Sequence, residues 1–321
     1  MTSRAAGVGG NNMSVWGNDI NLINSNPSLL NKNMSNQATM NYCNYVSNMN
    51  FGYLAYAKNF EKVGIFAASL GFLDYGKFKG YDELGNETRS FRAGDYCLTL
   101  NYAWHLPEDT NFNIGIGVKN ILSQYEAYKA FATAVDFGGT YHTKKDFVVS
   151  IVAKNIGHVW KDLTTTPGQQ MTLPKTVQFG LSKKLKKAPI RLLIVYDNLL
   201  KWNLKYVSPI DTAGQSNPFD TGKAPTDSTK FQKFYAKFGS NVDNFMRHLS
   251  FGTELLFSKN FTVMVGFNYR RQREFSLPER RGANGLCFGF NFKVKKLQFS
   301  YSYNQMAFAG GSSIFGLTYK L

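Results

Sequence analysis

Histidine and cysteine are the side chains most often used in acid–base, nucleophilic and metal chemistry, and this chain of 321 residues has few of them. The four histidines are His105, His142, His158 and His248. The three cysteines, which have neither CxxC nor zinc spacing, are Cys43, Cys97 and Cys287. No carboxylate or nucleophile stands at a catalytic spacing from a histidine, although a Ser-His-Asp arrangement is defined by geometry alone. We expect no catalytic residue, metal site or cofactor.

A run rich in arginine is the strongest candidate for binding chemistry. It combines five guanidinium groups with one aromatic ring, from Arg270, Arg271, Arg273, Arg280, Arg281 and Phe275. The planar guanidinium fork matches phosphate and carboxylate groups, so these residues are candidate contacts for lipid phosphates or an acidic partner. Alternatively, Arg270 and Arg271 point inward or pair with Glu274 and Glu279. Trp202, Tyr206 and Tyr81 are further candidate anchors for a partner.

The formal charge of +16 would favour nucleic acid or another anionic partner. The lysines, however, gather in short turns, such as Lys144-Lys145 and Lys293 with Lys295-Lys296, and not along a helix or a nucleic-acid motif. We therefore interpret most of them as solvated turn charges and expect no nucleic acid.

The elements that carry these residues have a period of two. Phe261, Val263, Val265, Phe267 and Tyr269 alternate with Thr, Met, Gly, Asn and Arg, and similar segments occur in both halves of the chain. One parity is large and aromatic and the other is Gly, Ser, Asn and Thr, whereas exposed faces of soluble sandwiches carry Lys, Glu and Thr. No apolar run approaches the roughly 20 residues of a spanning helix. The pattern predicts lipid-facing strands around a small, polar interior.

The pattern predicts about fourteen strands, an even number that suits a closed barrel. They are 37–47, 50–58, 62–73, 93–105, 110–120, 128–141, 146–155, 173–185, 190–197, 245–257, 261–274, 282–293, 296–305 and 311–321. Short connections alternate with longer ones, which include 74–92, 156–172, 198–244 and 274–282. We therefore predict an all-β fold, a 14-stranded antiparallel transmembrane β-barrel in a Gram-negative outer membrane. The long loops, above all about 198–244, would face the cell surface.

Residues 1–36 do not follow the strand pattern. Their start, residues 4–10, is small and flexible in composition, Val15 to Asn24 is predicted as a short helix, and Leu22, Ile23, Leu29 and Leu30 are apolar anchors. We predict an N-terminal hatch, residues 1–36, inside the lumen of a barrel formed by residues 37–321. No signal peptide is visible in this numbering, so an outer-membrane protein would have carried one before Met1.

The hatch residues carry a resemblance to a known family. Arg4 with Gly9-Gly10, then Asn18-Asp19, then Asn26-Pro27-Ser28, resemble the start of FadL-like outer-membrane proteins, whose hatch motif is Asn-Pro-Ala; Ser28 departs from it. Three further segments, 199–206, 247–254 and 266–274, resemble the PorV/PorQ branch of these barrels, which belongs to the type IX secretion system.

The resemblance implies a non-enzymatic role. It implies an anchor for the cell-surface attachment complex, with PorZ, PorU and PorV as partners, which joins cargo to anionic lipopolysaccharide. The alternative is a FadL-like transporter of hydrophobic small molecules, which predicts an apolar pocket between hatch and wall and a kinked strand. A general porin is disfavoured by the hatch. The sequence leaves open whether the lumen is sealed and which loop meets which partner.

Overall fold

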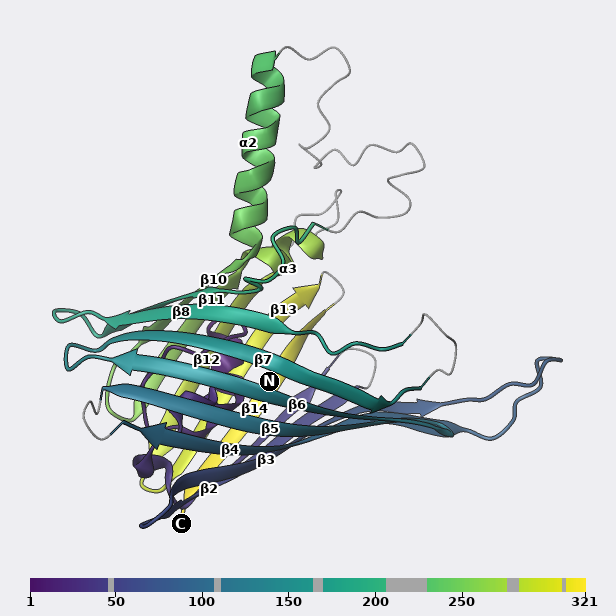
Figure 1. The fold of residues 1–321 in the computed structure, drawn as a ribbon, viewed down its shortest axis with the longest axis horizontal. Coiled ribbons are helices and arrows are strands. Elements are labelled where there is room, and N and C mark those ends of the chain that lie inside the picture. Colours follow the sequence, from purple (N-terminus) through teal and green to yellow (C-terminus); the bar gives the residue numbers. More distant parts are fainter. Residues whose placement is uncertain (46–48, 107–110, 164–169, 206–229, 276–282, 308–309) are drawn as a thin grey trace.

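The computed structural model describes residues 1–45, 49–106, 111–163, 170–205, 230–275, 283–307 and 310–321 (Figure 1). Its strands are β1 (Gln37–Asn44), β2 (Asn50–Phe60), β3 (Gly64–Phe78), β4 (Phe91–His105), β5 (Phe112–Tyr125), β6 (Tyr128–His142), β7 (Phe147–Lys161), β8 (Thr176–Lys184), β9 (Ile190–Tyr196), β10 (Leu249–Leu255), β11 (Phe261–Asn268), β12 (Leu286–Val294), β13 (Leu297–Ala307) and β14 (Gly310–Lys320). Its helical segments are α1 (Ser3–Gly7), η1 (Ile20–Asn24), η2 (Pro27–Leu29), η3 (Lys32–Met34), α2 (Lys230–Arg247) and α3 (Tyr269–Glu274).

The fourteen strands form one closed antiparallel barrel. Each strand pairs with its neighbours in the chain, and β1 closes the circle by pairing with β14, from Gln37 opposite Lys320 to Asn44 opposite Ser313. Closure satisfies the backbone N–H and C=O groups that an open edge would leave unpaired in hydrocarbon. The predicted fold class and number of strands are confirmed.

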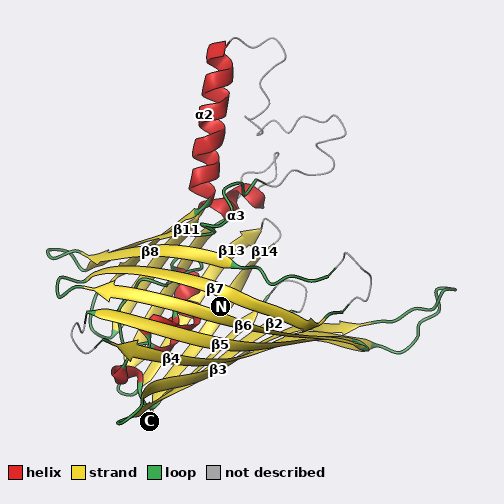
Figure 2. Cartoon of the chain, in the orientation of Figure 1, coloured by secondary structure: helices red, strands yellow, loops and turns green. Residues whose placement is uncertain are grey.

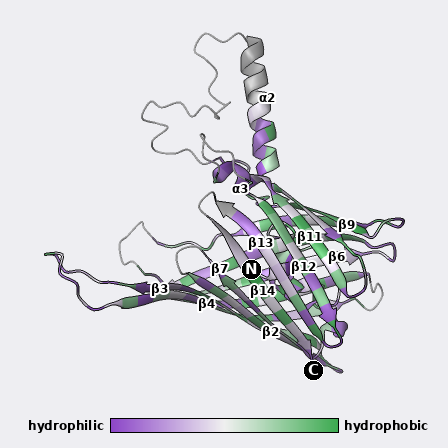
Figure 3. Ribbon diagram, turned by 180° about the vertical axis from the view of Figure 1, so that it is seen from behind, coloured by the Kyte–Doolittle hydropathy of each residue, from purple (hydrophilic) through white to green (hydrophobic). Residues whose placement is uncertain are grey.

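Alternating side chains explain why these segments are strands in a membrane. On β12, Phe288, Phe290 and Phe292 are exposed on the outer face, whereas Cys287, which precedes Phe288, and Gly289, which follows it, are buried. Exposed large apolar residues recur along the strands around the barrel, and Figure 3 shows how apolar and polar residues alternate on them. No helix among the described residues is long and apolar enough to cross a membrane.

The barrel wall has two unequal parts. The long-strand wall, β3–β7, has strands of 14 or 15 residues. The short-strand wall, β8–β12, has strands of 7 to 9 residues. In Figure 1 the long strands extend well past the rest of the barrel, and α2 and α3 stand over the short-strand wall instead.

The first 36 residues fill the interior, so the hydrophobic core lies inside the lumen (Figure 2). Helix α1 contacts β11–β14, and η2 contacts β4–β6 on the opposite side. Apolar hatch side chains pack against small or apolar inward-facing residues of β2, β3, β4, β9 and β11. The hatch members of this core are Val8, Val15, Ile20, Leu22, Ile23, Leu29, Leu30 and Met34.

Three local predictions are wrong. The strand predicted over 261–274 ends at Asn268, because the Asn268 side chain accepts a hydrogen bond from the Arg271 N–H and starts α3. The strand predicted over 245–257 begins only at Leu249, because α2 starts within the predicted long loop 198–244 and continues to Arg247. In the hatch, residues 3–7 are helical, whereas in the predicted helix over 15–24 helical structure starts only at Ile20, after the capping carboxylate of Asp19.

Candidate functional site

A buried network of charged side chains ties the hatch to the short-strand wall. The Arg4 guanidinium on α1 donates from Nε to Oε1 of Glu254 on β10 at 3.0 Å, and its Nη1 lies 3.2 Å from Oδ2 of Asp19. Arg191 on β9 reaches Oε2 of Glu254 at 2.7 Å. Glu254 is fully buried. Buried charges are tolerated only when paired and hydrogen-bonded, so these two acids and two arginines stabilise one position of the hatch.

Hydrogen bonds fix the hatch to the long-strand wall. Asn26 donates from Nδ2 to the carbonyl of Met13 and to Oγ1 of Thr140 on β6, both at 2.9 Å. Its Oδ1 accepts from the Ser28 N–H at 2.9 Å, which caps η2, and Pro27 occupies the first position of that turn. The Asn-Pro pair singled out in the sequence therefore links one hatch turn to the wall, and Ser28 adds a contact of its own to Thr140 at 2.7 Å.

Backbone approaches backbone where the hatch meets the short-strand wall. Gly9 has φ +98° and Gly10 has φ +103°, conformations that favour glycine. On β11, a Cβ added to Gly266 would lie 2.1 Å from the backbone nitrogen of Gly9. Such contact leaves no space for any side chain at Gly266. The Gly-Gly pair of the hatch thus lies where the chain turns tightly against the wall.

A cavity separates the hatch from the long-strand wall. It has a volume of about 240 Å³. Ile23 of the hatch and Phe51, Leu73 and Ile121 of the barrel contribute apolar side chains to its lining. We call it the hatch–wall cavity.

The polar side of the hatch–wall cavity is internally paired. Lys119 on β5 lies 2.7 Å from Oδ2 of Asp136 on β6. Asp95 on β4 accepts hydrogen bonds from the hydroxyls of Tyr75 at 2.7 Å and Tyr125 at 3.0 Å. These groups are satisfied by one another, so the cavity offers an apolar surface beside polar groups that already have partners.

The closed barrel, the lumenal hatch and the cavity can be compared with solved structures. The structure is similar over its whole length to the TodX deltaS2S3 mutant monoaromatic hydrocarbon channel, with a TM-score of 0.56, 10% identity and 99% of that chain covered. It is also similar to the toluene transporters TbuX of Ralstonia pickettii and TodX of P. putida, each with a TM-score of 0.54, at 12% and 11% identity, with 100% of this chain and 98% of each of those chains covered. The fold is that of the FadL-like outer-membrane barrels.

At these identities the likeness shows the fold alone. The sequence matches no family model and is similar to no curated protein. The FadL-like architecture predicted from the sequence is thus confirmed, whereas the resemblance to the PorV/PorQ branch stays a prediction.

The arginine-rich run lies on α3, beside the end of α2. Arg270 donates from Nε to Oε1 of Glu274 at 2.7 Å, which is the pairing that the sequence offered as an alternative. Arg273 lies 2.9 Å from Oδ1 of Asp243 on α2. Arg271 points toward the hatch, since a Cβ added to Gly10 would lie 2.8 Å from its Nη2. Phe275 is exposed. Arg280, Arg281 and Glu279 lie outside the described residues.

Asp243 is the centre of the junction between α2 and α3. Its carboxylate meets Arg247 at 2.9 Å, Arg273 at 2.9 Å and the hydroxyl of Tyr269 at 2.8 Å. Burial alone would raise the pKa of the Asp243 carboxyl group, but the hydrogen bonds from Arg247 and Tyr269 and the charges of Arg247 and Arg273 lower that pKa below its ordinary value. The junction therefore depends on an ionised Asp243.

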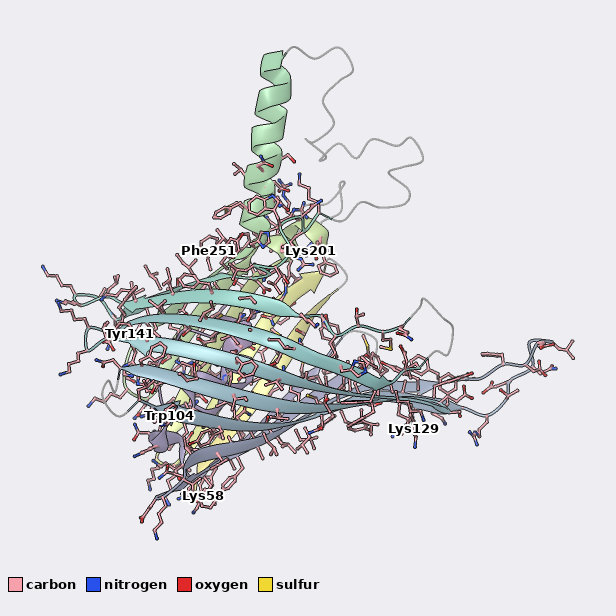
Figure 4. All side chains as sticks on the ribbon, in the orientation of Figure 1. Lys58, Trp104, Lys129, Tyr141, Lys201 and Phe251 are labelled. Atoms are coloured by element: carbon pink, nitrogen blue, oxygen red, sulfur yellow. The ribbon has the colours of Figure 1, made fainter. Side chains whose placement is uncertain are left out.

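His248 joins the segment after β9 to the same junction. Its two ring nitrogens face backbone carbonyl oxygens, Nδ1 at 2.7 Å from Asp197 and Nε2 at 2.9 Å from Trp202. The ring stacks between Tyr196, at a centroid distance of 4.8 Å, and Trp202, at 5.7 Å. We call residues 197–205, 239–248 and 269–275 the cap; Figure 4 shows Lys201 of this region beside α3, at the base of α2. Tyr206 lies outside the described residues.

The remaining candidates for chemistry are dispersed. Cys43, Cys97 and Cys287 are unpaired thiols, and the described part of the chain contains no cluster of three His, Cys, Asp or Glu side chains able to hold a metal ion. His142 stacks on Trp16 of the hatch at a centroid distance of 4.0 Å. Tyr81, on the connection between β3 and β4, is exposed and far along the chain from the cap.

Sequence reasoning named Asp19 and the segment that contains Glu254 only as parts of a resemblance, and it missed that both acids hold Arg4. A signal was present for Glu254, because it occupies the inward parity of β10, where its neighbours on that face, Ser250 and Gly252, are small. A carboxylate on such a position needs a buried cation as its partner.

Proposed function

We propose that this protein is an outer-membrane transporter for small, largely apolar molecules, and that its substrate passes through the hatch–wall cavity. The observation that carries the proposal is a cavity between the hatch and the long-strand wall of a FadL-like barrel, with an apolar surface beside polar groups that pair with one another. The similar solved structures are a monoaromatic hydrocarbon channel and toluene transporters, which supports the same substrate class. Ligand pockets are concave and mostly apolar with a few polar groups.

An irregular strand beside the cavity supports a route out of it. The register between β3 and β4 shifts between Asp74 and Lys77. Leu73, the residue before this irregularity, lines the cavity. Bulges bend strands and locally disrupt pairing, so this part of the wall is the place where a substrate would leave the lumen with the least cost in broken hydrogen bonds.

Filling the cavity tests this proposal. Gly71 lines the cavity, and a Cβ added there meets no atom closer than 4.0 Å, the distance to the Cys97 carbonyl oxygen, so Gly71→Leu can be accommodated while it occupies ligand space. Binding and vesicle uptake of radiolabelled toluene should fall about tenfold or more. The matched control is Gly239→Leu on α2, where nothing lies within 4 Å of an added Cβ. Wild-type protein that takes up no apolar molecule, or a Gly71→Leu variant with unchanged uptake, would refute the proposal.

A second candidate function rests on a different observation, the apolar surface of the cap. Leu199, Leu200, Trp202, Val242 and Phe245 are all exposed there. Exposed apolar groups gathered in one region are typical of protein-interaction sites. We propose, as the alternative, that the cap faces the cell surface and docks the attachment complex of the type IX secretion system, with PorZ, PorU and PorV as partners, as the PorV/PorQ resemblance implies.

Affinity isolation separates the two candidates. Tagged protein would be isolated from outer membranes in mild detergent, and the bound material identified by mass spectrometry. Recovery of PorZ-, PorU- and PorV-like proteins, lost in a Leu200→Asp, Trp202→Asp variant, supports the anchor. Recovery of the barrel alone with a bound apolar molecule supports the transporter.

A further inference from the structure

A second cavity, of about 300 Å³, lies between the hatch turn at Gly9–Asn11 and the cap. We call it the cap cavity. Its barrel lining comes from β7, β8, β10 and β11, and the hatch and the cap line the rest. The barrel residues of the hatch–wall cavity lie on β2–β6, and Met1 and Asn24 of the hatch line both cavities. Most of its lining side chains are polar or charged. It therefore differs in chemistry from the cavity proposed to carry apolar molecules.

Positive charge dominates the lining of the cap cavity. Four cations line it, Lys154, Arg247, Arg270 and Arg271, against one carboxylate, Asp197. A half-enclosed space with an excess of one charge sign concentrates the field and attracts the opposite sign. The excess implies an anionic occupant.

Two of these cations form no salt bridge in the described part of the chain, although the charges of Asp136 and Asp197 act on Lys154. Arg247 pairs with Asp243 and Arg270 pairs with Glu274. For Lys154 and Arg271, no ion pair is formed within the described ranges, and Nη1 of Arg271 is buried without a hydrogen-bond partner. Leaving a charged group buried and unpaired costs free energy. A ligand that supplies acceptor oxygens to Arg271 would remove that cost.

We propose that the cap cavity binds the phosphate group of a small hydrophilic molecule, in the class of sugar phosphates. A phosphate monoester carries a charge of about −1.5 to −2 at neutral pH and three strong acceptor oxygens. Two cations without a salt bridge suit a phosphate dianion better than they suit a monoanionic carboxylate ligand, and the guanidinium of Arg271 presents a fork to two phosphate oxygens.

The neutral part of the lining indicates what the phosphate is attached to. Gln178, Ser250 and Asn268 contribute amide and hydroxyl groups to the cavity. Such groups donate to and accept from sugar hydroxyls, and they give an apolar tail little favourable contact. The volume also exceeds what one phosphate group would occupy. The site therefore goes beyond the proposed transport of apolar molecules and does not depend on it.

Calorimetry on the full chain in detergent micelles tests this site with glucose 6-phosphate as the probe. Glucose and inorganic phosphate are the reference ligands. Lys154→Gln with Arg271→Gln should weaken glucose 6-phosphate binding about tenfold or more, since both cations without a salt bridge are lost. The matched control, Lys129→Gln with Arg92→Gln, removes two exposed cations of the long-strand wall, carries the same charge change and should bind like wild type.

Each outcome decides the proposal. Tight binding of glucose 6-phosphate, loss in the paired variant and weaker binding of both reference ligands support it. Equal binding of glucose, an unaffected paired variant, or no binding by wild type overturns it. Equal binding of inorganic phosphate overturns the sugar part. If the paired variant does not fold, Arg271→Lys keeps the charge but loses the fork, and unchanged affinity in that variant overturns the role of Arg271. Toluene uptake that persists while phosphate binding fails separates this site from the transport proposal.

Discussion

The two walls of this barrel hold the same hatch in different ways. Against the short-strand wall, the hatch makes a buried ion network at Glu254 and backbone contact at Gly266. Against the long-strand wall, it makes hydrogen bonds through Asn26 but leaves the hatch–wall cavity open. The hatch also borders the cap cavity at Gly9–Asn11, so the tight attachment to the short-strand wall is limited to the ion network and the contact at Gly266. One wall therefore holds the hatch through buried charges and backbone contact, and the other holds it through neutral hydrogen bonds.

The largest effect is expected from Glu254→Ala. Removing this carboxylate leaves Arg4 and Arg191 buried without their shared partner, and breaking a buried pair in this way costs about 3–5 kcal/mol. The measurement is the free energy of unfolding in urea, in lipid vesicles.

Glu87→Ala is the matched control for this loss. Glu87 also pairs with a cation, Lys79 at 2.9 Å, but both side chains are more than half exposed, so the expected change is about 0–1 kcal/mol. Equal losses in the two variants would show that the buried network does not hold the hatch.

Adding one methyl group to each wall compares them directly. Gly266→Ala places a Cβ 2.1 Å from the Gly9 nitrogen, whereas Gly71→Ala meets nothing closer than 4.0 Å. Overpacking costs about 1–3 kcal/mol, so Gly266→Ala should destabilise the protein by that amount and expose the hatch to trypsin at Arg4. Gly71→Ala should change neither quantity. A hatch equally protected in both variants would remove the distinction between the walls.

A smaller effect is expected from Trp202→Ala in the cap. The Trp202 ring stacks on His248 but is itself more than half exposed, so about 0.5–1.5 kcal/mol of local stability is at stake. Hydrogen exchange of residues 239–248 should become faster, while exchange in β3–β7 stays the same. Faster exchange throughout the barrel would mean that the cap is not an independent unit.

The smallest effect concerns pH. Because the Asp243 pKa is below its ordinary value of 3.8 in the folded cap, its stabilisation is fully present above 3.8 and is lost as the pH falls through the lower folded value. With partial exposure, it amounts to about 1 kcal/mol or less. Trp202 fluorescence should be constant at neutral pH and change only in this acid range, and Asp243→Asn should abolish the change. A transition near neutral pH would contradict this assignment.

The sequence was sufficient to predict the strands of the barrel wall, because the signal for each strand lies within the strand itself. Every spanning strand must face lipid on one parity, so Phe288, Phe290 and Phe292 alternate visibly with small or polar residues. The same pattern gave a wrong prediction where the N-cap residue of a helix, Asn268, ended the strand. Tyr269 continues the alternation of β11, but the Asn268 side chain turns the backbone into α3.

The candidate sites were less predictable because their partners are distant in the sequence. Arg4 was singled out for the hatch, but nothing local pairs it with Glu254, 250 positions later. For the arginine-rich run the sequence left two hypotheses open, a binding surface or inward and paired arginines; Arg270 pairs with Glu274, Arg273 pairs with Asp243 in the cap, and Arg271 lines a cavity beside Gly10. These arginines point in different directions because α3 is a helix, whereas the alternating pattern predicted a strand over these residues.

The pairing of Gln37 with Lys320 has a consequence for biogenesis. The barrel closes where β14 meets β1, and one partner of the hatch, Thr318, lies on β14. The hatch therefore cannot complete its contacts until β14 has been synthesised. Contacts between residues so remote in sequence make folding slow. We therefore expect docking of the hatch to be one of the last steps of folding.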